Sequence, residues 1–95
     1  MLDETTAGKL AETFRVLSDP TRVRIVSALA EREQCVHELA DALGLSHSAT
    51  SHQLGMMREM RLVVGTKQGR HVVYRLDDDH VSDLFRLGLS HVAHV

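Results

Sequence analysis

Apolar residues recur at helical spacing both before and after Gly44, and this arrangement constrains the fold more than any other feature. Residues 36–43 are predicted to form a short helix, and a glycine directly after it can adopt the left-handed conformation that ends a helix. Ser46 or Ser48 is expected to cap a second helix that runs to about residue 61. Two helices joined by so short a turn predict a helix-turn-helix, with an ordinary helical hairpin as the alternative.

The second of these helices begins with short hydrogen-bonding side chains and continues with apolar ones. A surface with so little bulk can enter the DNA major groove and reach base edges with its N-terminal residues. Leu54, Met57 and Met60 are then expected to face the core. In the alternative interpretation, the serines and threonine are only caps and solvent contacts. The predicted DNA-contacting residues of this helix are His47, Ser48, Thr50, Ser51, His52 and Gln53.

A β-rich stretch follows over residues 62–76, and Gln68-Gly69 within it predicts a compact hairpin turn. Lys67 and Arg70 lie on either side of that turn. A hairpin with basic residues at its tip, directly after a base-reading helix, suits contacts with DNA phosphates. We therefore predict a wing in which Lys67 and Arg70 bind the DNA backbone. Its two strands are expected over 62–67 and 70–76.

Two further helices are predicted before the helix-turn-helix. Thr5 or Thr6 is expected to cap the first, and Asp19 followed by Pro20 is a start signal for the second, which runs to about residue 30. In a domain this small, we expect the N-terminal helix to pair with the C-terminal one at a dimer interface. The apolar sides of the two helices are Leu10, Phe14 and Leu17, and Val23, Val26 and Leu29 with Ile25 flanking them.

Charge is distributed unevenly along a chain whose formal net charge is −2. Residues 46–76 carry five basic side chains against the single acidic Glu59, whereas the segments on both sides are acidic. A basic segment inside an acidic protein indicates a surface that faces phosphates. The five basic residues are Arg58, Arg61, Lys67, Arg70 and Arg75.

The 95 residues, with only two Phe and one Tyr, predict a single domain over 1–95 whose core consists of Leu, Val and Ala. Cys35 is the only cysteine, which excludes an internal disulfide and fits a reducing cytoplasm. The sequence has no apolar run long enough to span a membrane, and its N-terminus lacks the basic and apolar regions of a signal peptide. We therefore expect a cytoplasmic protein with no membrane partner.

Residues 77–95 are predicted to form one helix, with Asp77 or Asp78 as its N-terminal cap. Apolar residues recur along it at steps of three and four. They are Val81, Leu84, Phe85, Gly88, Val92 and Val95. A second stripe beside them carries three of the seven histidines and consists of His80, Leu84, Leu87, His91 and His94.

The spacing of these histidines indicates a metal site shared between two chains. His91 and His94 are three residues apart, so they share a helix face and can chelate one ion. His80 lies eleven residues before His91, roughly 16 Å along the helix, and ligand bonds of about 2 Å cannot span that distance. An antiparallel copy would place Asp78 and His80 of one chain beside His91 and His94 of the other. The pattern predicts two such sites per dimer, suited to zinc or cobalt, with solvated histidines as the alternative.

Over nearly its whole length, the chain resembles the ArsR/SmtB family of metal-sensing transcriptional repressors. The matching segments are LSDPTRVRIV (17–26), CVHELADALGLSHSATSHQL (35–54), KQGRHVVYRL (67–76), DDHV (78–81) and HVAH (91–94). The resemblance implies a mainly α winged helix-turn-helix with a small β-hairpin. It also implies a homodimer, formed through the first and last helices, that binds an imperfect palindrome in double-stranded operator DNA.

The resemblance also matches the functional positions of the family to individual residues of this chain. In this resemblance, Asp78, His80, His91 and His94 match the ligands of members that sense zinc, cobalt or nickel, and His47, Ser48, Ser51 and His52 fall where the family contacts DNA. Many members carry a Cys-x-Cys pair for soft ions, but here the sequence is Cys35-Val36-His37, which is a poor soft-metal cage. We expect Cys35 to be a small buried residue. No histidine precedes His37, and the chain ends one residue after His94, which favours zinc or cobalt over nickel.

The resemblance further implies that the metal-free dimer represses and that metal releases it from DNA. It suggests that the second ring nitrogen of metal-bound His91 donates to a backbone carbonyl near Arg61. A metal-independent repressor that responds to redox change or a small molecule through Cys35 is the nearest alternative. A zinc enzyme is more distant, because four protein ligands leave no open position for water. We therefore expect no catalytic residues.

Overall fold

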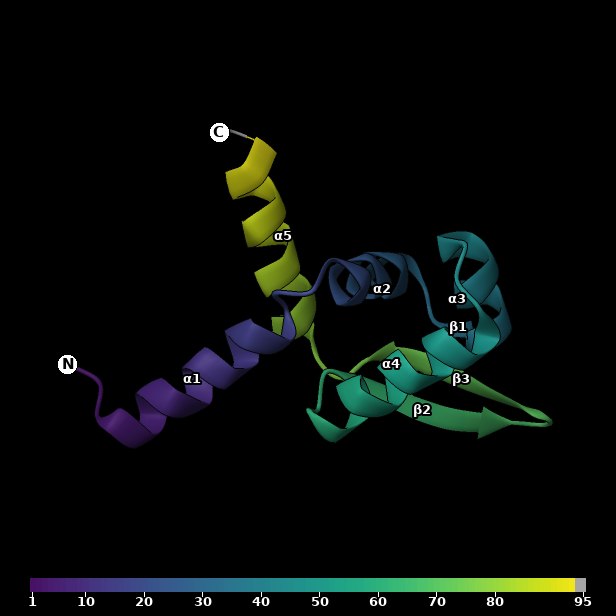
Figure 1. The fold of residues 1–95 in the computed structure, drawn as a ribbon, viewed down its shortest axis with the longest axis horizontal. Coiled ribbons are helices and arrows are strands. Elements are labelled where there is room, and N and C mark those ends of the chain that lie inside the picture. Colours follow the sequence, from purple (N-terminus) through teal and green to yellow (C-terminus); the bar gives the residue numbers. More distant parts are fainter. Residues whose placement is uncertain (94–95) are drawn as a thin grey trace.

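The computed structural model describes residues 1–93 of the chain. Its elements are α1 (Glu4–Val16), α2 (Pro20–Glu31), β1 (Gln34–Cys35), α3 (Val36–Leu43), α4 (His47–Glu59), β2 (Val63–Gln68), β3 (His71–Leu76) and α5 (Asp79–Ala93). In Figure 1, α2, α3, α4 and the sheet form a body from which α1 and α5 extend in different directions. The fold is thus mainly helical with one small antiparallel sheet, as predicted.

Aspartate caps begin the first two helices. Asp3 accepts a hydrogen bond from the Thr6 N–H at 2.6 Å and caps α1, so the prediction that Thr5 or Thr6 is the cap is wrong. Asp19 accepts from the Arg22 N–H at 3.0 Å and caps α2, as predicted. A carboxylate at this position accepts the hydrogen bond as threonine would and also interacts favourably with the helix dipole, which explains why aspartate is preferred.

The turn between α3 and α4 has the geometry that the sequence predicted. Gly44 adopts the left-handed conformation, with φ of 68°, and the Leu45 N–H donates to the Ala40 carbonyl at 3.0 Å. The Ser46 hydroxyl accepts from the Ala49 N–H at 3.0 Å and caps α4. Both ends of the turn are therefore satisfied by local hydrogen bonds, and the predicted helix-turn-helix is confirmed.

The core lies between α2, α3, α4 and the sheet. Its most buried large side chains are Ile25, Val26, Leu39, Leu54, Met57 and Val63. The prediction that Met60 also faces the core is wrong, because Met60 is 42% exposed. Since α4 ends at Glu59, the chain leaves helical geometry before the next apolar position is reached.

The three strands form an antiparallel sheet in the order β1-β3-β2. Gln68 pairs with His71, so the turn residues are Gly69 and Arg70, one position later than the predicted Gln68-Gly69. Gly69 has a φ of 63°, which glycine adopts without steric cost. The sequence did not predict β1, because a strand of two residues is too short to show an alternating pattern.

Much of the apolar surface of α1 and α5 is left uncovered. Phe14 is 53% exposed and Val92 is 68% exposed. A groove of about 510 Å³ runs between α1, α2 and α5, lined by Phe14, Leu17, Val23, Phe85, Leu89 and Val92 among other side chains. An apolar surface of this kind is suited to burial against a partner. Within residues 1–93, no helix combines the length and the apolar character needed to cross a membrane.

The same glycine-to-alanine change should have opposite effects at two positions. Gly44→Ala forces a β-carbon into the left-handed region and should destabilise the fold by about 1 kcal/mol. Gly55→Ala lies inside α4, where an added Cβ meets no atom within 4 Å, and should stabilise it by roughly 0.5–1 kcal/mol. Urea unfolding at equal protein concentration measures both. A Gly44→Ala variant as stable as wild type would contradict the assigned turn.

Candidate DNA interface and metal-ligating helix

Four predicted DNA-contacting residues form one exposed face at the start of α4. They are His47, Ser48, Ser51 and His52. His47 and Ser51 are four residues apart, as are Ser48 and His52, so each pair lies on one side of the helix and the two pairs form adjacent stripes. The face is short, polar and free of large side chains, which is what insertion into a major groove requires.

Two other predicted members of this face point differently. Thr50 is fully buried, and its Oγ1 donates to the Ser46 carbonyl at 2.9 Å. Thr50 therefore belongs to the core, which corrects its assignment as a DNA-contacting residue. Gln53 is half-buried at the edge of the face, and its buried Oε1 has no hydrogen-bond partner among residues 1–93.

The sequence did not predict that His37 lies beside this face. The His37 and His47 rings lie 5.1 Å apart between centroids, with their planes at 83°. His37 is exposed on α3, and His71 is exposed at the start of β3. Nine residues, including the turn, lie between the pair in the chain, so no local spacing could have indicated the contact.

The basic side chains of residues 46–76 are available for contacts with DNA. Lys67 and Arg70 are exposed at the wing, as predicted, with Lys67 near the end of β2 and Arg70 in the turn itself rather than beside it. Ion pairs in the described part of the chain use Arg15, Arg32 and Arg86, together with a contact of His80. None of these four belongs to the basic segment. Within residues 1–93, its five cations therefore have no ion-pair partner to give up before they meet phosphates.

Glu38 holds the start of α3 in place. Its Oε1 accepts from the Cys35 N–H and its Oε2 from the Arg32 guanidinium, both at 3.0 Å. The Cys35 N–H and then the Arg32 side chain lower the pKa of the Glu38 carboxyl to about 2. Cys35 itself is half-buried rather than buried as expected, because it lies at the N-terminal cap of α3.

Asp78 and His80 lie together at the start of α5. Asp78 Oδ1 accepts from the backbone N–H of His80 at 2.8 Å and of Val81 at 3.3 Å, so Asp78 caps this helix as predicted. Asp78 Oδ2 is 3.3 Å from His80 Nδ1. Partial desolvation raises the pKa of the Asp78 carboxyl, but hydrogen bonds from the His80 side chain and from the Val81 and His80 N–H groups outweigh it and lower the pKa overall. The carboxyl is therefore ionised at neutral pH and able to bind a cation.

Of the other two predicted ligands, the structure describes only His91, which lies eleven residues after His80 on the same helix. His91 is exposed near the C-terminal end of α5, and His94 lies outside the described residues, as does Val95 of the apolar stripe. Within residues 1–93, no three His, Cys, Asp or Glu side chains come close enough to hold one metal ion. The same holds around Cys35 and His37, which lack a third ligand in the described region. One chain presents Asp78 with His80 and, separately, His91.

Together, a helix-turn-helix with an exposed polar face and a two-stranded wing with unpaired cations define a winged helix-turn-helix DNA-binding protein. Residues 19–64 match the family described as bacterial regulatory protein, arsR family. The chain is 48% identical over 86 residues to a transcriptional repressor SmtB homolog from Synechocystis, which covers 90% of this chain and 65% of the relative. It is 39% identical over 94 residues to the regulator NmtR of Mycobacterium tuberculosis, which covers 99% of this chain and 78% of the relative.

A solved structure of a similar protein has the same fold. The homodimeric winged helix-turn-helix domain of a possible ArsR-family regulator from Mycobacterium bovis has a TM-score of 0.86 at 26% identity, over 100% of this chain and 94% of that one. The chain belongs to the ArsR/SmtB family, as the sequence resemblance implied. Both relatives are named as transcriptional regulators, which agrees with the expectation that it is not an enzyme. The chain spans slightly less than two thirds of the Synechocystis relative.

The lowered pKa of Glu38 predicts an acid-dependent contribution to stability. A carboxyl whose pKa falls on folding stabilises the fold above its ordinary value, near 4.5, and loses that effect as the pH falls toward about 2. The stability difference between wild type and Glu38→Gln should therefore be constant above about pH 5.5 and shrink below pH 4.5. Urea midpoints across this range measure it.

Arg32→Ala provides the control, because it removes the ion pair and keeps the larger Cys35 contribution. Its pH dependence should be weaker than that of wild type but still present. An equal difference between wild type and Glu38→Gln at pH 7 and pH 2.5 would show that the carboxylate contributes nothing.

Proposed function

We propose that this protein is a metal-responsive transcriptional repressor. Its metal-free homodimer binds a palindromic operator, and Zn²⁺ or Co²⁺, with Ni²⁺ less favoured, releases it by binding at two intersubunit sites. The observation that carries the proposal is the placement of Asp78 and His80 together at the first turn of α5, with His91 on the same helix roughly 16 Å away.

The Asp78–His80 pair fits the chemistry of a zinc-type ion. In a tetrahedral site with ligand bonds of about 2.0–2.1 Å, two ligand atoms are separated by roughly 3.3–3.4 Å. Asp78 Oδ2 and His80 Nδ1 are 3.3 Å apart and both side chains are largely exposed. The spacing matches one edge of such a tetrahedron, and an ion would replace the proton that the His80 side chain shares with Asp78. In the proposal, His91 and His94 of a second chain supply the opposite edge.

The need for a second chain is supported by the surface of the protomer. The apolar groove between α1, α2 and α5 adjoins the helix that carries the ligands. Burying Phe14, Leu89 and Val92 against a second copy removes apolar surface from water, which favours association. The homodimeric relative from Mycobacterium bovis has the same fold. Dimerisation and metal binding in this proposal therefore use the same helix.

DNA binding is assigned to the exposed face of α4 and to the wing. A two-fold dimer presents two such helices to successive major grooves, about 34 Å apart. His47, Ser48, Ser51 and His52 read base edges, while Lys67 and Arg70 contact phosphates. Gln53 remains a candidate at the edge of this face.

A hydrogen bond at the base of the wing connects the two functions. The Asp77 N–H donates to the Leu62 carbonyl at 2.9 Å, so the residue before Asp78 is tied to the segment that follows α4. An ion that fixes the geometry of the α5 pair therefore also constrains the α4 helices. The family resemblance adds a second link, from the free ring nitrogen of metal-bound His91 to a backbone carbonyl near Arg61. By linkage, DNA lowers metal affinity by the same factor as metal lowers DNA affinity.

Binding of the protein to a palindromic fragment from its own promoter region tests the proposal. Titration with Zn²⁺, Co²⁺ and Ni²⁺ at fixed salt should lower the DNA affinity of wild type by about tenfold or more. His91→Ala and His94→Ala should bind DNA and no longer respond. His91→Asp, which can ligate but has no N–H, should keep ion binding and lose most of the release.

His71→Ala is the matched control, because it removes an exposed histidine outside α5. It should retain the metal response whatever its effect on DNA affinity. If no ion changes DNA binding by wild type, the metal-responsive assignment is wrong, and Cys35 becomes the residue to examine.

A further inference from the structure

Arg61 has an unfavourable backbone conformation. Its φ is 60°, and no other non-glycine residue between 1 and 93 has a positive φ. In this left-handed region, the β-carbon of an L-residue crowds the backbone, which costs free energy that glycine avoids. The chain uses glycine at the two other positions of this kind, Gly44 and Gly69.

The end of α4 dictates this conformation. The Leu62 N–H donates to the Met57 carbonyl at 2.9 Å, and the Arg61 N–H donates to the Arg58 carbonyl at 3.0 Å. This pair of bonds is the Schellman motif, which places the residue after the cap, here Arg61, in the left-handed conformation. Glycine is the usual residue at that position. Arginine therefore occurs where the local backbone favours glycine.

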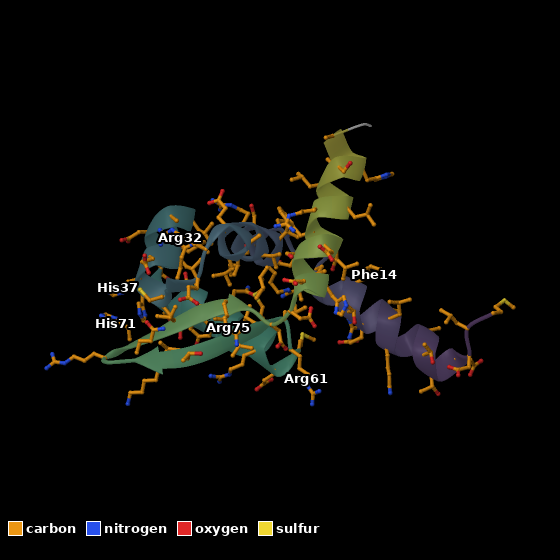
Figure 2. The ribbon with its side chains drawn as sticks, turned by 180° about the vertical axis from the view of Figure 1, so that it is seen from behind. Phe14, Arg32, His37, Arg61, His71 and Arg75 are labelled. Carbon is orange, nitrogen blue, oxygen red and sulfur yellow. The ribbon has the colours of Figure 1, made fainter. Side chains whose placement is uncertain are left out.

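No ion pair within residues 1–93 explains the presence of the Arg61 side chain. It is exposed, and it makes no ion pair with any residue of the described chain. Figure 2 shows it extending away from the ribbon at the end of α4, at the opposite end of the hairpin from the wing tip. Arg58, in the last turn of α4, is also exposed and unpaired within residues 1–93.

An exposed, unpaired arginine beside a base-reading helix is suited to binding phosphate. Its planar guanidinium donates two parallel hydrogen bonds to phosphate oxygens and keeps its charge at every physiological pH. We propose that Arg61 contacts a DNA phosphate next to the groove that α4 enters, and that the protein retains it there at a cost in stability. This contact holds the C-terminal end of α4 on the DNA, while Lys67 and Arg70 hold the wing. The inference rests on the DNA-binding part of the proposed function, and its test uses the metal-free protein.

Arg61→Gly tests this proposal because stability and DNA affinity should change in opposite directions. Relieving the left-handed strain should raise Tm by several degrees at equal protein concentration. Removing the phosphate contact should weaken metal-free binding to the promoter palindrome and to an unrelated duplex alike. The slope of log affinity against log salt should fall by about 0.9 per arginine lost, or about 1.8 for a dimer.

Two further variants distinguish the effect of the positive charge from the effect of the backbone conformation. Arg61→Lys keeps the charge and the strain, so it should retain the Tm and the salt slope of wild type. Lys9→Ala removes an exposed cation from α1, away from the proposed interface, and should leave the salt slope unchanged. Sedimentation of each variant reports whether the dimer is intact.

The outcomes decide the proposal. A more stable Arg61→Gly dimer that binds both duplexes more weakly, with a reduced salt slope, supports the contact. The proposal is overturned if Arg61→Gly keeps the DNA affinity and the salt slope of wild type. It is also overturned if Arg61→Gly loses DNA binding only because the dimer is lost. If wild type binds the unrelated duplex as tightly as the palindrome, operator recognition fails, but the slope comparison still tests Arg61.

Discussion

The rise of the α-helix, about 1.5 Å per residue, is the constraint on which the proposed metal site depends. It holds His80 and His91 roughly 16 Å apart on one rigid element, and no side-chain rearrangement can bring both to one ion. The site can therefore close only if a second chain supplies the other half. The chain has an uncovered apolar groove beside that helix, and its first two proposed ligands, Asp78 and His80, have Oδ2 and Nδ1 3.3 Å apart. The ligand spacing calls for an antiparallel second helix, and the exposed apolar groove favours association with a second chain.

In the proposed mechanism, the base of the wing connects this pairing to the DNA-binding helix. The hydrogen bond between Asp77 and Leu62 continues the β2–β3 ladder by one residue, so the hairpin ties the end of α4 to the start of α5. A change in the angle between two α5 helices therefore has to be accommodated near the reading helices. At this junction the chain also carries its single left-handed non-glycine residue in the described range, Arg61. In this account, the C-terminal end of α4 is where stability is lost for the sake of DNA contact.

Features set by local interactions were predictable from the sequence. Gly44, the Asp19 cap with its following proline, and the Asp78 cap are each determined by residues a few positions apart, and the structure places them as predicted. The predictions were wrong where packing against residues distant in the chain determines a side chain's position. Thr50 was assigned to the polar face from its chemistry, but the rotation of α4 on the core buries it. Met60 was assigned to the core by period, but the Schellman turn ends the helix first.

Other features could not be predicted because they join distant segments or lack a pattern. β1 has two residues and exists only through its pairing with β3. The contact between His37 and His47 depends on how α3 and α4 cross. The metal tetrad itself is an intermolecular prediction: a single chain can present its parts, Asp78 with His80 and separately His91, but cannot assemble them.

Mixed dimers test the intersubunit site most directly. One variant, Asp78→Ala/His80→Ala, lacks the first half of each site, and another, His91→Ala/His94→Ala, lacks the second half. Neither homodimer should bind Co²⁺ with the visible absorption of a tetrahedral site. Equilibrating the two should create mixed dimers with one intact and one doubly defective site, which recover one ion per dimer. Recovery of that signal on mixing supports the account. A mixture that shows no more Co²⁺ absorption than its components, with mixed dimers confirmed by mass spectrometry, would contradict it.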